Sequence, residues 1–366
     1  MLSIRTRVPL VALAAAAALT TAACGSTKAK APSSGNGAGA STSAAAASLP
    51  ADGEAAFATA LAALGSGSSV TAKLSIGAST SDLAVLGEVT SDGSDDSSSN
   101  SADEKLGLEA LGGNITFAVT STDGSPLDKA GTKTSSDVTV NGASGTLFET
   151  KTIAGVLYVR AAVPKILSLS GTPSSALAPA HKLAQNPKLA FIDNALAGDW
   201  LKLDLGALSG LARQGGATPG LAGDLGAKVI AALRGDVTVE RGATNGDETD
   251  LTLSAPVKKV ATDLVGVART VPQLGAALSQ VDLSKVPERT VKIDAKVKGS
   301  SLSQISIDIF QFFPAKDQPT LSGHHFPIQL DFSQAPVTVT APATSTPVDL
   351  PSLIGAALSG GLKPTA

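Results

Sequence analysis

The chain has 366 residues, with 28 basic and 31 acidic side chains and a formal net charge of −3. A weakly acidic chain without a block of lysines and arginines is a poor partner for nucleic acid, so we expect none to bind. A single cysteine means that no disulfide can form within one chain. Aromatic residues make up only 3%, so the core must be built from aliphatic side chains.

The first 23 residues have the layout of a secretory signal peptide. Arg5 and Arg7 form a short positive segment, Val8–Ala18 is an apolar run, and small residues follow it. The apolar run, at roughly 11–16 residues, is too short to favour spanning a bilayer. We therefore expect residues 1–23 to be an export signal that is removed.

The lone cysteine, Cys24, ends the string LTTAAC, which resembles the lipobox of bacterial lipoproteins. That resemblance implies that Cys24 receives a diacylglyceryl group and becomes the first residue of the mature chain. Thr21 departs from the pattern, because leucine is commonest three positions before the cysteine. An ordinary signal peptide with an incidental cysteine is the alternative. No His or Asp lies near Cys24, so nothing favours a catalytic thiol.

Residues 24–48 are predicted to be a disordered tether that follows the lipidated cysteine. The segment is mostly Gly, Ser, Ala, Thr and Lys, and it has no large apolar residue. Such a segment cannot bury enough surface to offset the entropy lost on ordering. A flexible tether of about 25 residues has an r.m.s. reach of ~25–30 Å.

The folded domain is expected over residues 49–340. Asp52 is placed to cap a helix whose apolar residues recur at helical spacing up to Gly65. Strand-like alternation follows in SVTAKLSIGA and NITFAVTST. The acidic string at residues 91–104, between them, lacks the spacing of an EF-hand and is predicted to be a solvated loop.

The middle of the domain continues with strands at SDVTVN, GTLFETKTI and GVLYVRA, with turns at Asn141-Gly142 and Ala154-Gly155. Residues 163–234 carry mostly helical signals. The only tryptophan of the chain follows Gly198, in the strand-like string DWLKLDL. Two more strands, GDVTVERG and TDLTLSA, precede a helical pattern that begins at Val257.

The clearest alternation lies in RTVKIDAKVKGSSLSQISIDIF and in FPIQLDF. Apolar residues take every second position on both sides of a Gly-Ser-Ser turn, which indicates an antiparallel hairpin with one wet face. At least eight strands with few helices favour the α+β class, with helices on the apolar face of an antiparallel sheet. Residues 341–366, which begin APATSTPVDLP, are predicted to be a loose tail.

Three histidines, His181, His324 and His325, are the candidates for metal or catalytic chemistry. Adjacent residues of a strand point to opposite faces, so His324 and His325 do not both enter one site if that segment is extended. Asp317, the nearest carboxylate before them, lies in a proline-rich loop. This spacing favours ordinary surface histidines over a metal pair, and we expect neither a metal nor a cofactor.

The sequence contains no G-x-S-x-G elbow, no H-E-x-x-H pair and no P-loop. Glu149 and Lys151 share one strand face, and we interpret them as solvent-facing partners rather than an acid/base pair. The string GLAGDLG, Gly220–Gly226, lacks a preceding strand and the G-x-G-x-x-G spacing, so a flexible helix start is the better interpretation. We therefore predict that the protein is not an enzyme.

The order of these elements resembles the actinobacterial LppX/LprAFG-type lipoproteins. The resemblance rests on the lipobox, the tether, the first helix, FETKTIAGVLYVRA, the Trp-containing strand, VDLSKVPERTVKIDAKVKGSSLSQISIDIFQF and FPIQLDF. It implies the LolA-like fold, a strongly curved antiparallel sheet or half-barrel with helices that cover its concave face. The acidic loop and the glycine-rich middle region are departures from that family.

The resemblance implies a membrane-anchored extracytoplasmic lipoprotein at the outer face of the cytoplasmic membrane that binds a lipid or other hydrophobic ligand in an apolar cavity. The alternative is a non-catalytic envelope scaffold with a filled core; protein partners are not readable from the sequence. We expect the inward strand residues to line the cavity: Leu157, Val159, Leu251, Leu253, Val291, Ile293, Ile305, Ile307, Ile309, Ile328 and Leu330.

The anchor is testable by replacing Cys24 with serine. Acyl chains contribute roughly 0.8 kcal/mol per buried CH₂, so a diacylglyceryl group should hold the protein to membranes through salt washing. The Cys24→Ser variant should therefore leave the washed membrane fraction when cells are fractionated. Recovery of the variant in that fraction at the unmutated level would contradict the anchor.

Overall fold

The structure is a computed structural model that describes residues 49–90, 109, 111–206, 237–269, 288–314 and 316–350. The predicted export signal, Cys24, the tether, the acidic loop at 91–104, the string Gly220–Gly226 and the tail from residue 351 lie outside the described residues. The chain divides into two compact units, which we describe separately. Unit 1 comprises residues up to Val70, Asp123–Thr132 and Gly220–Ala335, and unit 2 comprises the remainder.

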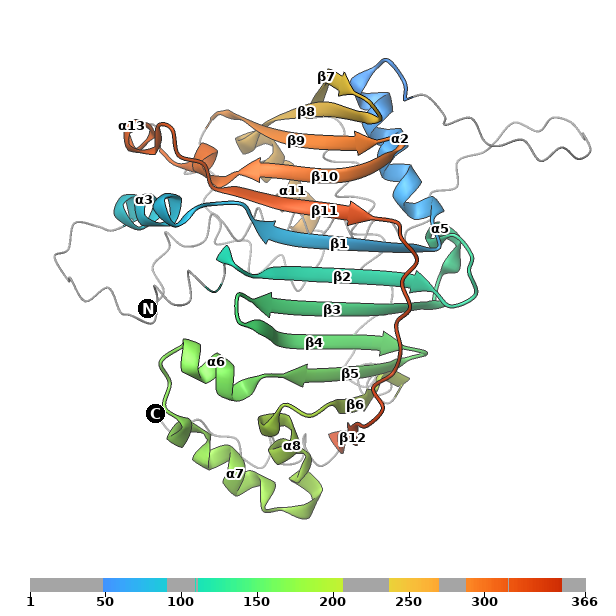
Figure 1. Cartoon of the computed structure of the whole chain (residues 1–366), viewed down its shortest axis with the longest axis vertical. Coiled ribbons are helices and arrows are strands. Elements are labelled where there is room, and N and C mark those ends of the chain that lie inside the picture. The colour runs from blue at the N-terminus through green and yellow to red at the C-terminus, as the bar shows by residue number, and fades with distance from the viewer. Residues whose placement is uncertain are drawn as a thin grey trace, which may run out of the picture. The chain divides into compact units, whose positions relative to one another are not determined.

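Unit 1 is built on antiparallel strands in the order β11-β10-β9-β8-β7 (Figure 1). Helices and a 3-10 turn connect or cover these strands. The elements are β7 (Thr238–Asn245), β8 (Glu248–Pro256), β9 (Thr290–Lys298), β10 (Ser301–Asp308), β11 (Pro327–Ser333), α2 (Gly53–Ser66), α5 (Leu127–Ala130), α11 (Val257–Arg269), η5 (Ile309–Phe312) and α13 (Gln318–Leu321).

The predicted hairpin of unit 1 is confirmed, with its apolar residues on one face. Ile307 pairs with Ile293 of β9 and with Ile328 of β11, so the apolar stripes of three strands share one face. Gly299 takes the turn with φ +61°, a left-handed value that favours glycine. The expected strand position of Ile309 is wrong, because β10 ends at Asp308. The carboxylate of Asp308 accepts the Phe310 N–H at 3.0 Å and starts the 3-10 turn η5.

Helix α2 covers the apolar face of unit 1. Asp52 caps it as predicted, with its carboxylate accepting the Ala55 N–H at 2.8 Å. The small residues Ala56 and Ala60 are completely buried against a cluster that includes Leu251, which is 1% exposed. At the start of the helix, a Cβ on Gly53 would lie 2.3 Å from the carbonyl oxygen of Val239, so the close approach to β7 requires glycine.

Unit 2 contains strands in the order β12-β6-β5-β4-β3-β2-β1, and the neighbours from β2 to β6 are antiparallel. The division between the units falls inside β1. The elements are β1 (Ser69–Ile76), α3 (Thr80–Thr90), β2 (Asn114–Ser121), β3 (Thr134–Gly142), β4 (Gly145–Ile153), β5 (Val156–Ala161), α6 (Val163–Leu169), η2 (Ser174–Leu177), α7 (Ala178–Ala184), η3 (Pro187–Leu189), α8 (Phe191–Ala197), β6 (Leu201–Asp204) and β12 (Thr346–Pro347).

Unit 2 departs from the sequence prediction at three places. The turn expected at Asn141-Gly142 lies two residues later, because Gly142 itself pairs with Gly145 across the hairpin. Helix α3 was not predicted. The segment from residue 341, predicted to be loose, contains β12, which pairs in parallel with β6 through Thr346↔Leu201.

Despite these differences, the predicted α+β class is confirmed. Both units consist mainly of antiparallel strands, and in unit 1 a helix packs on the apolar face of those strands.

The packing of unit 1 predicts losses of stability of different size for substitutions at two adjacent residues of β8. Leu251→Ala should lower the free energy of unfolding by about 2–5 kcal/mol, because it leaves a cavity under α2. Thr252→Ala removes a half-buried side chain from the opposite face and should cost less than about 1 kcal/mol. Chemical denaturation measures both changes. Equal losses would show that the assignment of faces is wrong.

Candidate functional site

The central strands of unit 2 present one apolar face. The register places Phe117, Val138 and Val159 in one row across β2, β3 and β5, with Thr150 of β4 between the last two. The row continues to Leu201 on β6. Parallel rows on either side belong to the same face. Its aliphatic and aromatic members are Ile115, Phe117, Val119, Val138, Val140, Phe148, Leu157, Val159, Ala161, Leu201 and Leu203.

All these apolar side chains are only half-buried. The opposite face of the same strands is largely polar, yet it contains the fully buried residues Ala118, Ser135, Glu149 and Tyr158. In these strands, buried residues therefore lie on the polar face, whereas the apolar face is only half-buried. Half-buried aliphatic side chains leave apolar area in contact with water, which costs free energy unless a ligand or another surface covers that area. We call the face formed by these apolar residues, with the Thr and Ser residues in the same rows, the open apolar face.

The two predicted cavity residues of unit 2 lie on the open apolar face. Leu157 pairs with Leu203, and Val159 pairs with Leu201. Both lie near the side of the strand order where the short strand β12 adjoins β6.

The predicted cavity residues of unit 1 are more tightly packed. Leu251, Leu253, Ile293 and Ile305 belong to the cluster under α2 or pack against it. Val291, Ile309 and Leu330 are buried, whereas Ile307 and Ile328 are half-buried neighbours in one row. The structure thus brings the unit 1 residues together, mostly in a filled core.

Most of the open apolar face was missed by the sequence analysis. The residues that were not singled out include Phe117, Val138, Phe148, Leu201 and Leu203. The signal was present, because the strings NITFAV, DVTV and LKL place apolar residues at every second position. What the sequence did not show was that these residues would be left half-buried while others would be packed.

The predicted solvent exposure of Glu149 is wrong. Glu149 is 7% exposed, and its carboxylate accepts the Arg160 Nε–H at 2.9 Å and lies 3.2 Å from Lys151 Nζ. Asp137 completes the cluster, 3.5 Å from the same ammonium. The ring of Trp200 lies 4.8 Å from the Arg160 guanidinium and 5.4 Å from Lys151 Nζ. Both distances allow cation–π attraction, so Trp200 adds to this charged cluster on the polar face.

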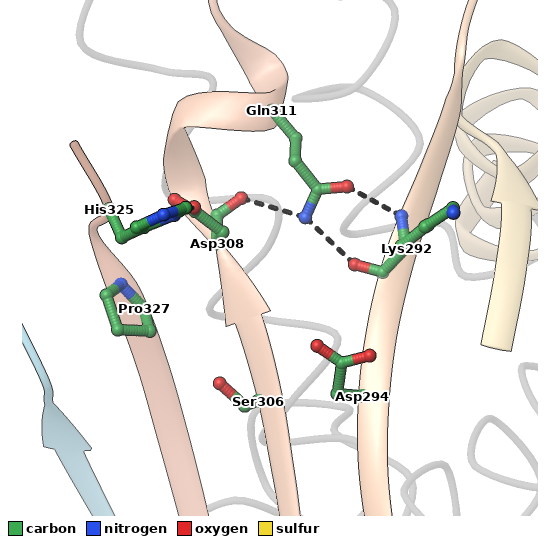
Figure 2. A pocket seen from close by; sticks show the side chains of 7 residues that line it. All are labelled: Lys292, Asp294, Ser306, Asp308, Gln311, His325 and Pro327. Atoms are coloured by element: carbon green, nitrogen blue, oxygen red, sulfur yellow. Dashed lines mark hydrogen bonds and ion pairs between the residues drawn. The ribbon is translucent and has the colours of Figure 1, made fainter. Parts of the chain in front are cut away.

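A polar hollow of about 440 Å³ lies in unit 1, on the face opposite to Ile293 and Ile307 (Figure 2). It is lined by Lys292, Asp294, Ser306, Asp308, Gln311, His325 and Pro327. The side chain of Gln311 bonds to both the N–H and the carbonyl of Lys292, at 2.6 and 2.9 Å, and so extends the pairing of β9. With charged and amide groups around it, this hollow does not match the apolar cavity that the sequence predicted.

The histidines pair with carboxylates that lie far from them in the sequence. His325 Nδ1 is 2.8 Å from Asp308, not beside Asp317, and His181 Nδ1 is 2.8 Å from Asp193. Within the described ranges, no three His, Cys, Asp or Glu side chains gather closely enough to hold a metal ion.

Three surface groups have shifted pKa values. Hydrogen bonds from Ser144 lower the pKa of Glu109, the hydrogen bond from Lys258 lowers that of Glu288, and the hydrogen bond to Glu248 raises that of Lys296. Each shift stabilises the form already charged at neutral pH. A general acid or base needs a pKa moved toward neutrality, so these three groups are not tuned for proton transfer.

Among the residues that the structure describes, no helix combines the length and the apolar character needed to cross a bilayer.

The solved structures that this chain resembles include two lipoproteins. LppX of Mycobacterium tuberculosis is 13% identical, with a TM-score of 0.31, and the match covers 78% of this chain and 97% of that one. LprF of Mycobacterium bovis is also 13% identical, with a TM-score of 0.32, and the match covers 81% and 100%. The resemblance noted in the sequence is thus found again, but it carries no residue's role over to this chain. No protein-family model and no curated protein matches.

The charged cluster yields a prediction that the single tryptophan can report. Glu149→Gln keeps the size of the side chain but removes the buried negative charge that faces Lys151 and Arg160. The free energy of unfolding should fall by about 2–4 kcal/mol. Urea denaturation monitored by Trp200 fluorescence measures this change. Asp137→Asn, whose ion pair with Lys151 is longer, should cost less than about 1 kcal/mol. A change below about 0.5 kcal/mol for Glu149→Gln would contradict a stabilising role for the cluster.

Proposed function

We propose that this protein is a lipid-anchored lipoprotein of the cell envelope, held at the outer face of the cytoplasmic membrane, that binds a hydrophobic ligand on the open apolar face. One observation carries the ligand-binding part: the apolar face of β2–β6 is half-buried while the polar face behind it holds buried residues. The sequence around Cys24 carries the anchoring part.

The chemistry of the face determines the class of ligand. Its rows contain Val, Leu, Ile, Phe, Ala, Thr and Ser, and none of its members carries a charge. Such a surface attracts methylene groups, at about 25 cal/mol per Å² of apolar area removed from water. An acyl chain or a comparable hydrocarbon is therefore the proposed ligand. A polar substrate would find only threonine and serine hydroxyls as partners there.

A second candidate function is an envelope scaffold with a filled interior. The packing of unit 1 favours it, because α2 fills the apolar face of β7–β10 and leaves Leu251 1% exposed. If the open apolar face were filled in the same way by other parts of the chain, no ligand would be needed. The two functions differ in whether a hydrophobic molecule competes for that face.

Binding of a radiolabelled long-chain fatty acid to the full-length Cys24→Ser protein tests the proposal. Val138→Asn removes apolar area from the centre of the face and should weaken binding about tenfold, for a loss of about 1.4 kcal/mol. Thr139→Asn, the adjacent half-buried residue on the polar face, is the matched control and should stay within about twofold.

The measurement separates the two functions directly. Saturable binding that Val138→Asn weakens and Thr139→Asn spares supports the ligand-binding function. Absence of saturable binding to the parent protein leaves the scaffold, and equal weakening by both variants places the ligand elsewhere.

A further inference from the structure

We infer that the helical segment at residues 163–198 docks on an anionic membrane surface. The segment, called the β5–β6 insert below, contains α6, η2, α7, η3 and α8 and joins β5 to β6. The inference rests on the anchoring part of the proposed function, which brings the bilayer within reach. It adds a contact surface and the kind of partner that the surface fits.

Helix α6 is apolar in sequence but buries none of its residues. Its sequence VPKILSL holds four large aliphatic side chains, of which Val163, Leu167 and Leu169 are half-buried and Ile166 is exposed. Ile166 is 39% exposed, which makes it the most exposed large hydrophobic side chain among the described residues. The 3-10 turn η2 that follows also has no buried residue. A helix of this composition normally packs its apolar side chains away from water.

The charge of the insert identifies the partner. The chain between β5 and β6 carries Lys165, Lys182 and Lys188 against two carboxylates, Asp193 and Asp199, although the whole chain has a net charge of −3. Asp193 faces His181 at 2.8 Å, and Lys182 and Lys188 are exposed. The exposed Ile166 side chain and the lysines fit the interface of a bilayer with anionic lipids, where the former enters the headgroup region and the latter meet phosphates.

The position of the insert connects this surface with the open apolar face. Ala161 of β5 lies two residues before the first residue of the insert, and Leu201 of β6 follows the insert closely. Val159 and Leu201, the neighbouring pair on these strands, belong to the open apolar face. A membrane contact made by the insert would therefore lie beside strands that carry the proposed ligand surface, which suits transfer of an acyl chain to or from the bilayer.

A weak contact of this kind is sufficient for an anchored protein. The predicted tether of about 25 residues keeps the domain within ~25–30 Å of the surface, so docking is an intramolecular event at high effective concentration. Because the lysines are exposed, salt should weaken the contact.

The test places a fluorescent probe on the insert of the full-length, lipidated protein. Ile166→Cys adds a thiol to a chain whose one native cysteine is consumed by lipidation, so an NBD label attaches at a single position. The protein is reconstituted in phosphatidylcholine vesicles with or without phosphatidylglycerol. We expect NBD emission to rise about twofold or more with phosphatidylglycerol and to fall again with added salt. Adding Lys182→Glu and Lys188→Glu should remove most of that gain.

The matched control carries the label at Ala62→Cys, an exposed position of α2, and its emission should not depend on the lipid. Equal emission of the Ile166→Cys protein in both kinds of vesicle would overturn the inference. A probe that is already shielded in detergent solution would also overturn the inference. Shielding that rises with protein concentration would mean that a second copy covers α6, and shielding that does not would mean that another part of the chain covers it. Vesicle retention and fatty-acid binding are measured on the same samples, so failure of docking is distinguishable from failure of the proposed function.

Discussion

The constraint that organises this protein is the alternation of side chains along its strands. Successive residues point to opposite faces, so every strand with apolar residues at alternate positions creates an apolar face that has to be shielded from water. Unit 1 meets this need with helix α2, whose completely buried Ala56 and Ala60 allow the helix to approach the sheet closely. In unit 2 the same alternation leaves a face whose aliphatic side chains are all half-buried. The difference between a filled and an open face is the basis of the proposed function.

Much of the fold could be predicted because this alternation is local. The hairpin of β9 and β10 was predicted with the correct turn and faces, because the stripes of Ile293 and Ile307 are strict and the turn glycine between them is evident. The predictions failed where distant residues decide the local structure. Strand β10 ends at Asp308 because its carboxylate bonds to the Phe310 and Phe326 N–H groups, and β12 exists only through its pairing with β6.

The candidate site could be predicted only in part for a related reason. The sequence identifies which residues alternate, but not which apolar face a helix will cover, so residues from packed and open faces were grouped together. Leu251 is packed beneath α2, whereas Val159, an equally good candidate by pattern, is on the open face. Glu149 illustrates the same limit, because the side chains that cluster around it come from elsewhere in the chain, Arg160 from β5 and Trp200 from the position just before β6.

The central claim is that a hydrophobic ligand lies on the open apolar face rather than in unit 1. A photoactivatable diazirine fatty acid, crosslinked to the full-length Cys24→Ser protein and mapped by peptide mass spectrometry, tests it most directly. The account predicts saturable labelling on β2–β6, at peptides that contain Phe117, Val138, Val159 or Leu201. Labelling confined to the strands under α2, or labelling that excess unlabelled fatty acid does not reduce, would contradict it.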